Sequence, residues 1–344
     1  MTVKVAVVGA GNIGCAIGVQ LLHAGLDATL IARPQIAADI AANGLRLSDY
    51  RGQQWHRTAS QVPVSTTLDA AREATLVLLA VKCADVHATA DALAPQLRRD
   101  ALVVCLQNGI GSAERARARL PDQPVVSAIV PYNVARLGPG AYHIGTEGQL
   151  LFEAHPQLRP LAEALANRGI GAELRDDFAA VQWGKLLLNL NNAVNALSGL
   201  PLKAELSQRD FRRCLALAQR EALATLQAAA IQPAKLTPIA PRWLPTLLSV
   251  PDAVFRVAAR KMLAIDPLAR SSMADDLQRG RATEVDYLNG AVVELARRLG
   301  REAPVNQRLQ ALVHAAEQGG SHHWSAAALL AQLSASPSPH TPIA

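Results

Sequence analysis

VKVAVVGAGNIG, residues 3–14, is the stretch of sequence that decides the fold. Its first half is a short apolar run rich in valine, which is typical of a buried parallel strand. Its second half places Gly9, Gly11 and Gly14 in the pattern GxGxxG, where a helical stretch at residues 12–24 begins. Glycines at these positions allow a tight turn, let the backbone approach a pyrophosphate and let the helix pack closely on the strand. The stretch therefore predicts a dinucleotide-binding turn, although three glycines also occur in ordinary turns.

The first turn of this helix contains Asn12 and Ile13. The backbone N–H groups of a first helical turn have no partner within the helix, and the helix dipole places positive charge there. Both features favour a bound phosphate. We therefore expect Asn12 and Ile13 to bind the cofactor together with the three glycines.

Strand-like and helical stretches alternate after the glycine turn. The strand-like runs are residues 28–32, 75–81, 101–106 and 124–130, and helical stretches follow at residues 84–97 and 112–119. This rhythm favours βαβ units and a Rossmann-type, doubly wound α/β sheet. We also expect short strands within residues 44–66, and further strands at the edge of the sheet within residues 138–153.

The pattern changes near residues 176–180. Beyond this point no stretch is convincingly strand-like, and the helical stretches are residues 178–199, 207–230, 252–265, 271–279 and 284–299. We therefore predict a Rossmann-type domain at residues 1–177 and an all-helical domain at residues 178–333. The Pro/Ser-rich residues 334–344 are expected to form a disordered tail.

The composition narrows the class of protein. A chain of 344 residues predicts about two domains, and an apolar content of 50% allows a sizeable core. The net charge of +6 comes without an aromatic-rich basic patch, so it fits an anionic small substrate or a phosphate-rich cofactor better than nucleic acid. The cysteines show no metal or disulfide spacing, and no apolar stretch is long enough to span a membrane. We expect a cytoplasmic protein without a metal site.

The residue at the end of the second strand indicates which dinucleotide is bound. NAD enzymes usually carry an acidic residue there, which holds the ribose 2′-hydroxyl, whereas this chain has Arg33. A guanidinium can bind a 2′-phosphate with two hydrogen bonds, so we predict NADP(H). Lys82 and Asn108 follow two further strands and are expected at the same crevice, Lys82 beside the cofactor and Asn108 beside cofactor and substrate. The alternative is that all three are solvated surface residues.

A lysine and several asparagines interrupt the apolar pattern of residues 183–195. Asparagine is a poor helix former, so this many amides in one helix carry a cost. At roughly 100° per residue, Lys185, Asn189 and Asn192 form one stripe, and Asn191 points elsewhere. A lysine ammonium at a carbonyl oxygen can polarise the carbonyl and donate the proton that ketone reduction requires. The alternative is a solvated helix face.

A second polar cluster lies at residues 271–290. Ser272 and Glu284 would be about 18 Å apart on one straight helix, too far to share a small ligand. Gly280 offers a break, and Thr283 has the character of an N-cap with Asp286 as a weak capping-box partner. We therefore predict two helices with a turn at residues 280–282, an arrangement able to bring Ser272 and Glu284 to one pocket. Plain capping is the alternative for the residues around Glu284.

Together these motifs resemble those of the ketopantoate reductases (2-dehydropantoate 2-reductases). The resemblance spans residues 1 to about 315 and is carried by GAGNIG at 9–14, Arg33, VK at 81–82, QNG at 107–109, WGKLLLN at 183–189, SSMADD at 271–276 and TEVDYLNG at 283–290. It implies an NADPH-binding Rossmann domain, a helical domain of the 6-phosphogluconate dehydrogenase C-terminal type, and reduction of 2-dehydropantoate to pantoate on the way to coenzyme A.

The resemblance also implies roles for individual residues. Lys185 would be the general acid, and Glu284 would hold the substrate oxygen and the lysine in place. The positions that match the family's substrate contacts are Asn108, Asn189 and Ser272, and we expect Asn192 to bind substrate beside them. Those that match cofactor contacts are Gly9, Gly11, Gly14, Arg33 and Lys82.

Two departures from the family pattern concern the substrate. Many members carry asparagine at the positions of Ala193 and Ala269, and Asn192 is the nearest substitute for the first of these. The departures leave the reaction class intact but make the identity of the keto acid open. A related reductase of another 2-oxo acid or ketone is therefore the alternative, and a non-catalytic NADP-binding protein is disfavoured by the presence of Lys185 and Glu284. A monomer and a homodimer both remain compatible with the sequence.

Overall fold

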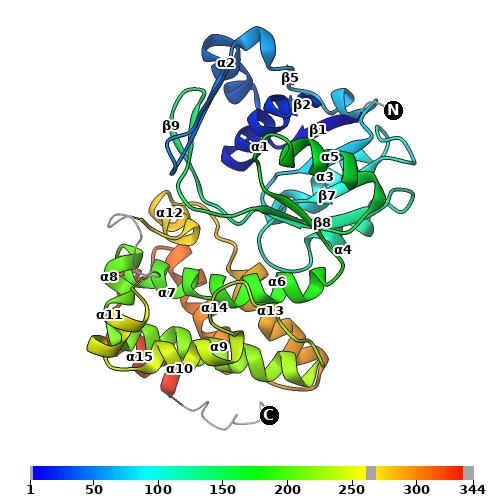
Figure 1. The fold of residues 1–344 in the computed structure, drawn as a ribbon. Helices are drawn as coiled ribbons and strands as arrows, with labels where there is room; N and C mark the ends of the chain where they lie inside the picture. Colours follow the sequence, from blue (N-terminus) through cyan, green and yellow to red (C-terminus); the bar gives the residue numbers. More distant parts are fainter. Residues whose placement is uncertain (1–2, 261–268, 336–344) are drawn as a thin grey trace. The chain divides into compact units, whose positions relative to one another are not determined.

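The computed structural model describes residues 3–260 and 269–335, which divide into two compact units at residues 178 and 179. Figure 1 shows the first unit as a sheet flanked by helices, and the second as a set of helices. The predicted helix at residues 252–265 is described only in part, as α11 (Asp252–Ala258), and all but the first two residues of the predicted tail at 334–344 lie outside the described residues.

The first unit contains all of the described strands. The strands are β1 (Lys4–Val8), β2 (Asp27–Ile31), β3 (Leu45–Asp49), β4 (Gln54–Arg57), β5 (Val64–Ser65), β6 (Leu76–Leu79), β7 (Leu102–Cys105), β8 (Val125–Ile129), β9 (Val134–Gly138), β10 (Ala141–Ile144), β11 (Leu150–Glu153) and β12 (Ala172–Arg175), and the helices are α1 (Asn12–His23), α2 (Pro34–Asn43), α3 (Val86–Leu93), α4 (Ser112–Arg117) and α5 (Arg159–Ala166).

The main sheet has the strand order β12-β11-β8-β7-β6-β1-β2-β5, and the strands from β8 to β5 run parallel. The chain builds β1 and β2 first and then crosses to the other side of β1 to add β6, so the strand order reverses at β1. Ligands of such sheets bind beyond the carboxyl ends of the strands at this reversal. The glycine turn follows β1 directly, and the predicted doubly wound fold is confirmed.

Both faces of the main sheet are buried at its centre, where the strands β1, β6, β7 and β8 are almost entirely apolar. Val5 and Val7 point into the core shared with α1 and α5, whereas Ala6 and Val8 point into the core shared with α3 and α4. Successive side chains of a strand alternate between faces. Each fully buried valine or leucine contributes about 1.5–3 kcal/mol, so this alternation accounts for the continuous apolar runs seen in the sequence.

The second sheet corrects one sequence-based expectation. We expected residues 138–153 to add strands to the edge of the main sheet, but β9 and β10 join β3 and β4 in a separate sheet of order β4-β3-β10-β9, and only β11 joins the main sheet. Leu47 and Ile144 of this second sheet belong to the same core as α1. The helix is thus covered by strands on the side away from the main sheet, which explains why α1 is buried over most of its length.

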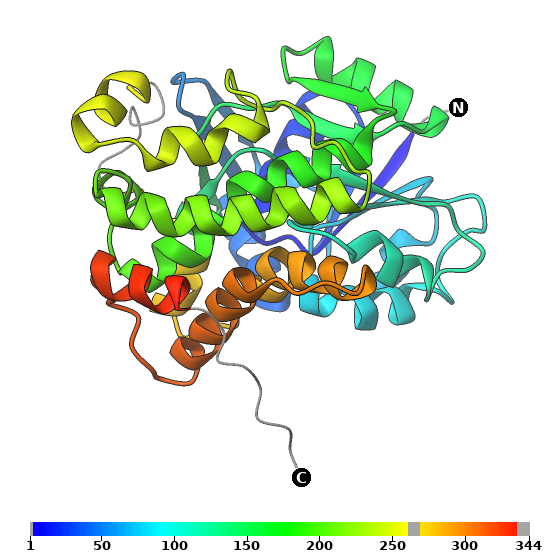
Figure 2. The ribbon, with the colours of Figure 1, turned by 90° about the horizontal axis from the view of Figure 1, so that it is seen from below.

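Every regular element described after Phe178 is a helix. These are α6 (Phe178–Asn189), α7 (Asn191–Ser198), α8 (Leu202–Leu206), α9 (Arg209–Ala228), α10 (Leu244–Ser249), α11, α12 (Ser272–Gln278), α13 (Val285–Arg298), α14 (Pro304–Glu317) and α15 (Ala326–Ser334). Figure 2 shows the long helix α9 crossing this unit with α10 and α15 packed along it. The expected single helix at residues 178–199 is wrong in one respect, because Leu190 interrupts it as a turn between α6 and α7.

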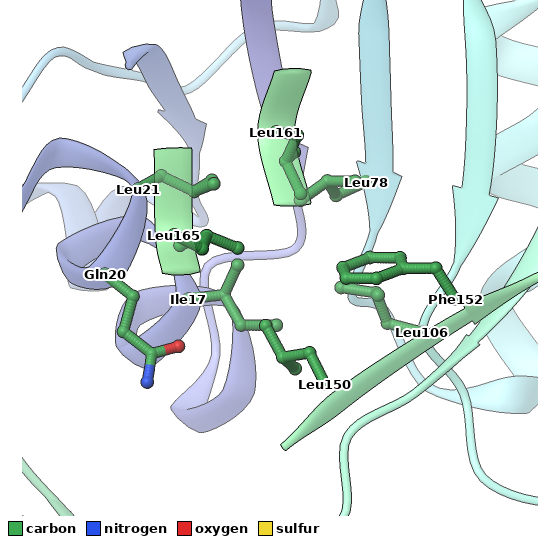
Figure 3. Close-up of a pocket in the computed structure, with 9 residues that line it drawn as sticks. All are labelled: Ile17, Gln20, Leu21, Leu78, Leu106, Leu150, Phe152, Leu161 and Leu165. Atoms are coloured by element: carbon green, nitrogen blue, oxygen red, sulfur yellow. The ribbon is translucent and has the colours of Figure 1, made fainter. Parts of the chain in front are cut away.

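A small cavity in the core of the first unit is not a ligand site. It lies among side chains of α1, α5 and the main sheet, all apolar except Gln20 (Figure 3). Gln20 Oε1 accepts a hydrogen bond from the buried Tyr132 hydroxyl at 2.8 Å. The volume is about 10 Å³, which is at the lower limit for one water molecule. The cavity is therefore too small for a dinucleotide or a keto acid.

Candidate active site

The glycine turn has the geometry that a dinucleotide requires. Gly9 has a φ of +96°, and a Cβ atom at Gly14 would lie 2.3 Å from the Gly9 carbonyl oxygen, so neither position accepts a side chain without strain. At Gly11, by contrast, a Cβ atom would meet no protein atom within 4 Å. The space above Gly11 is open, and the first turn of α1 carries no acidic residue. This cradle fits the phosphates of a dinucleotide.

Asn12 and Ile13 begin α1, but their side chains hold the protein together. The Asn12 amide donates to the carbonyl oxygen of Val134 at 3.0 Å and so ties α1 to the second sheet. Ile13 packs against the main core. The predicted contact with the cofactor phosphates therefore falls to their backbone N–H groups, which have no partner within the helix.

The other predicted cofactor residues follow strands that neighbour β1. Lys82 lies beyond β6 and Asn108 beyond β7, and the Cys83 thiol donates to the Asn108 carbonyl oxygen at 3.2 Å, which joins the two loops. The buried Gln107 amide donates to the carbonyl oxygens of Leu79 and Val81, at 2.8 and 3.0 Å. Gln107 therefore holds the loop after β7, which bears Asn108, against the loop after β6, which bears Lys82.

Arg33 directly precedes α2 at the carboxyl end of β2. Its side chain is 89% exposed, and its guanidinium lies 4.0 Å from the carboxylate of Asp85, at the limit of an ion pair. Arg33 is thus brought to the same edge as the glycine turn, with its guanidinium largely in solvent.

The helical unit places Lys185 in the middle of α6. The helix packs against the segment that follows α9, because Ala234 N donates to the Ala180 carbonyl oxygen at 2.8 Å and a Cβ atom at Gly184 would meet the Ala234 oxygen at 2.5 Å. Burial lowers the pKa of Lys185 from its ordinary value. Its amine has no hydrogen bond or ion pair within the part of the chain that the structure describes. A partly desolvated amine without a protein partner is available to a ligand.

The asparagines of α6 and α7 separate into two sets. Asn189 and Asn192 are half-buried, and their side-chain amides have no partner among the described residues. Asn191 is buried and donates to the side-chain oxygen Oε2 of Glu205 at 3.0 Å. Leu190 keeps helical dihedrals between the two helices, so the stripe formed by Lys185, Asn189 and Asn192 survives the break.

Ser272 begins α12, and its hydroxyl is exposed. The preceding residue, Ser271, is the N-cap, and its oxygen accepts from Ala274 N at 3.1 Å while its hydroxyl approaches the Asn192 carbonyl oxygen at 3.4 Å. These bonds bring two of the predicted substrate residues, Asn192 and Ser272, to neighbouring elements, since α12 packs against α7.

Glu284 stands at the start of α13, after the predicted break. Gly280 adopts a φ of +60° and ends α12, which confirms the turn. The helix begins one residue later than predicted, with Glu284 at the N-cap position and no capping bond from its side chain. The Thr283 hydroxyl still accepts from Val285 N at 3.3 Å, but Thr283 N donates to Glu317 rather than to Asp286. The Glu284 carboxylate has no hydrogen bond or ion pair with any described residue.

The expected capping box fails because α14 supplies other partners. His314 Nε2 lies 2.7 Å from Asp286 Oδ1, and His314 Nδ1 lies 2.8 Å from Glu317 Oε2. Glu317 in turn accepts from Thr283 N at 2.7 Å. Thr283, before Glu284, is therefore anchored to α14 through Glu317, and Asp286, after it, through His314.

This anchor predicts a pH-dependent contribution to stability. Partial burial opposes charge on His314, but the hydrogen bonds to Glu317 and Asp286 outweigh it and raise the pKa. The contribution is then complete below the ordinary value of 6.5 and is lost as pH rises through the raised value. His314→Gln should lower the free energy of unfolding by at most about 1 kcal/mol in acid, because the side chain is 40% exposed. Urea unfolding at several pH values measures this; a difference from wild type that persists unchanged at alkaline pH contradicts it.

Three further features concern metal ligands, membrane spans and the cysteines. Within residues 3–260 and 269–335, no group of His, Cys, Asp or Glu side chains is arranged to hold a metal ion. No described helix is long and apolar enough to cross a membrane. Cys15, Cys83, Cys105 and Cys214 are buried, and none forms a disulfide bond with another described residue.

Comparisons with known proteins agree with the residue pattern. Residues 5–157 match the family described as ketopantoate reductase PanE/ApbA, and residues 177–317 match its C-terminal domain. The chain belongs to the ketopantoate reductase family. A 2-dehydropantoate 2-reductase of Pyrobaculum aerophilum is 30% identical over 72% of this chain and 79% of its own, and one from Pyrococcus horikoshii is 28% identical over 92% and 99%.

Solved structures show the same fold. A family ketopantoate reductase from Ralstonia eutropha has a TM-score of 0.78 at 32% identity and covers 92% of this chain and 99% of its own. D-mandelate dehydrogenase with NADH has a TM-score of 0.76 at 20% identity and covers the same shares, 92% and 99%. The family and the N-terminal Rossmann-type fold identify the chain as a nicotinamide-dependent oxidoreductase that acts on a CH–OH group.

Sequence reasoning missed Asn195, Glu205 and Ser271. All three are buried and hydrogen-bonded to one another or to neighbours of the candidate site. A glutamate among apolar neighbours in a short helix, as Glu205 is, could have indicated a buried carboxyl group. Its partners could not be inferred, because Asn191 and Asn195 lie 14 and 10 residues earlier in the chain.

Proposed function

We propose that this chain catalyses the NADPH-dependent reduction of 2-dehydropantoate to pantoate. The observation that carries the proposal is the amine of Lys185, which is desolvated in an apolar helix and has no protein partner among the described residues. An amine so placed needs a ligand to receive its hydrogen bonds. The relatives named 2-dehydropantoate 2-reductase support the choice of substrate.

The residues of the first unit would bind and orient the cofactor. When bound, the reduced nicotinamide supplies the hydride that adds to the substrate carbonyl carbon. The glycine turn and the first-turn amides of Asn12 and Ile13 would bind the phosphates. Lys82 and Asn108 would line the space beyond β6 and β7, and Arg33 would bind the 2′-phosphate.

The residues of the second unit would donate the proton and bind the substrate. As the carbonyl becomes an alcohol, its oxygen gains negative charge and takes one proton, which Lys185 would donate from Nζ. The carboxylate of Glu284 would accept a hydrogen bond from the substrate and orient the lysine. Asn189, Asn192 and Ser272 would bind the remaining polar groups of the acid, since their side chains have no partner among the described residues.

A second candidate is a reductase of another 2-oxo acid, and Ala193 and Ala269 favour it. Ala193 is fully buried, and Ala269 accepts a hydrogen bond from Leu202 N through its backbone. Neither offers the amide that many family members carry. Steady-state assays with NADPH and a panel of 2-oxo acids decide between the two: a kcat/KM for 2-dehydropantoate far below that for another acid overturns the first candidate.

Arg33→Ala tests the choice of NADP(H). Removing a charge-assisted contact to the 2′-phosphate should raise the KM for NADPH about 10- to 100-fold and leave the KM for NADH nearly unchanged. Arg99→Ala is the matched control, because Arg99 is equally exposed at 89% and lies 3.9 Å from Asp122. Equal weakening of both cofactors by Arg33→Ala would show that Arg33 does not recognise the phosphate.

We infer a cytoplasmic enzyme that works as a monomer or a homodimer on a small keto acid. A structural relative from Staphylococcus aureus, with a TM-score of 0.71 at 18% identity, is described as a dimeric ketopantoate reductase. Sedimentation of the purified chain at micromolar concentration would distinguish the two states.

A further inference from the structure

A buried polar cluster lies beneath the proposed substrate residues of the helical unit. It consists of Asn191 and Asn195 of α7, Glu205 of α8 and Ser271 at the start of α12. Each side chain is at most 8% exposed, and those of Asn195 and Glu205 are fully buried. Buried polar groups are costly unless they are bonded, so the hydrogen bonds within this cluster favour the packing of α7, α8 and α12 that forms them.

Glu205 joins α8 to α7. Its Oε2 accepts from the Asn191 amide at 3.0 Å and from the Asn195 amide at 3.5 Å. Asn195 also donates to the Leu200 carbonyl oxygen at 3.0 Å. Burial raises the pKa of Glu205 to about 8, so near neutral pH the carboxyl is largely protonated. A neutral carboxyl suits a bonding role in the interior.

Asn195 joins α7 to the start of α12. Its Oδ1 accepts from Ser271 N at 3.0 Å across 76 residues of sequence. Ser271 then caps α12 through Ala274 N and lies 3.4 Å from the Asn192 carbonyl oxygen. The first turn of α12, which bears Ser272, is therefore fixed to the turn of α7 that bears Asn192.

We propose that Glu205, Asn191 and Asn195 are positioning residues, which hold the side chains of Asn192 and Ser272 at a fixed spacing for the substrate. None of the three is expected to touch the substrate. The proposal rests on the proposed function in one respect only, namely that Asn192 and Ser272 bind the keto acid. Loss of the cluster would let the start of α12 move relative to α7, which weakens substrate binding without removing a reacting group.

The test uses Asn195→Ala and Glu205→Ala, with Glu205→Gln as the conservative variant. The two alanine variants should raise the KM for 2-dehydropantoate about tenfold, as loss of a buried hydrogen bond does, with kcat within about threefold and the KM for NADPH unchanged. Glu205→Gln should restore the wild-type KM, because a glutamine keeps an uncharged acceptor of the same shape.

Ser325→Ala is the matched control for a purely structural effect. Ser325 caps α15 as Ser271 caps α12, with its oxygen accepting from Ala328 N at 3.3 Å. This variant should lower the unfolding midpoint and leave the KM unchanged. An equal rise in KM for Ser325→Ala, or an unchanged KM in folded Asn195→Ala, overturns the proposal.

Amide hydrogen exchange separates this proposal from the proposed function. The amides of residues 271–274 should exchange at least about tenfold faster in Asn195→Ala than in the wild type. This measurement needs no substrate, so it remains decisive if the wild-type chain does not reduce 2-dehydropantoate. Unchanged exchange in that segment would show that the cluster does not position α12.

Discussion

Replacing Lys185 with methionine is expected to lower kcat at least about 100-fold, as the loss of a general acid does. Methionine keeps the apolar stem and removes only the amine, so α6 should pack as before. The wild-type amine is desolvated and has no partner among the described residues, and a buried charge of this kind costs stability. The variant should therefore be at least as stable as the wild type.

The pH dependence of kcat is a second test of Lys185 as the general acid. A general acid must be protonated, and burial lowers the pKa of this amine below its ordinary value of 10.5. The rate should fall as pH rises through the lowered pKa, and this alkaline limb should be absent from the residual activity of Lys185→Met. Lys203→Met, at an exposed position of α8, is the control. Turnover by Lys185→Met close to the wild-type rate would remove the lysine from the chemistry.

Glu284→Gln is expected to reduce kcat/KM for the keto acid about 10- to 100-fold, which corresponds to the loss of one hydrogen bond to a charged group. The change keeps the shape of the side chain and removes its charge. NADPH binding should not change, since Glu284 would act on the substrate and the lysine. Kinetics at varied keto acid and separate fluorescence titration with NADPH measure the two effects.

A control is needed because Glu284 also occupies a helix N-cap. Glu302 is an exposed carboxylate just before α14, so Glu302→Gln removes a similar charge near a helix start. We expect it to leave kcat/KM unchanged. Should Glu284→Gln behave like this control, Glu284 would be no more than a residue at the start of a helix.

Much of the fold could be predicted because its signals are local. Valines at 5, 7 and 8 and glycines at 9, 11 and 14 act through period-two burial and backbone freedom, which depend only on near neighbours. Gly280 ended α12 as expected for the same reason. The exact cap of α13 could not be predicted, because Thr283 and Asp286 found partners on α14, at Glu317 and His314.

Part of the candidate site could also be predicted from the sequence, because the helical repeat is a local signal. A helical repeat of roughly 100° per residue placed Lys185, Asn189 and Asn192 on one stripe. It could not say which amides are tied to the protein and which have no protein partner, since that depends on Glu205 and Ser271, which reach α7 only through tertiary packing.

The sequence by itself thus determined the strand–turn–helix unit, the change from an α/β to a helical unit, and the residue types able to bind a dinucleotide and protonate a ketone. Only the tertiary structure decided which strands formed the second sheet over α1 and which asparagines became buried and hydrogen-bonded to other helices. Local periodicity encodes elements, whereas the choice of a hydrogen-bond partner dozens of residues away is made by the packing that excludes water from both groups.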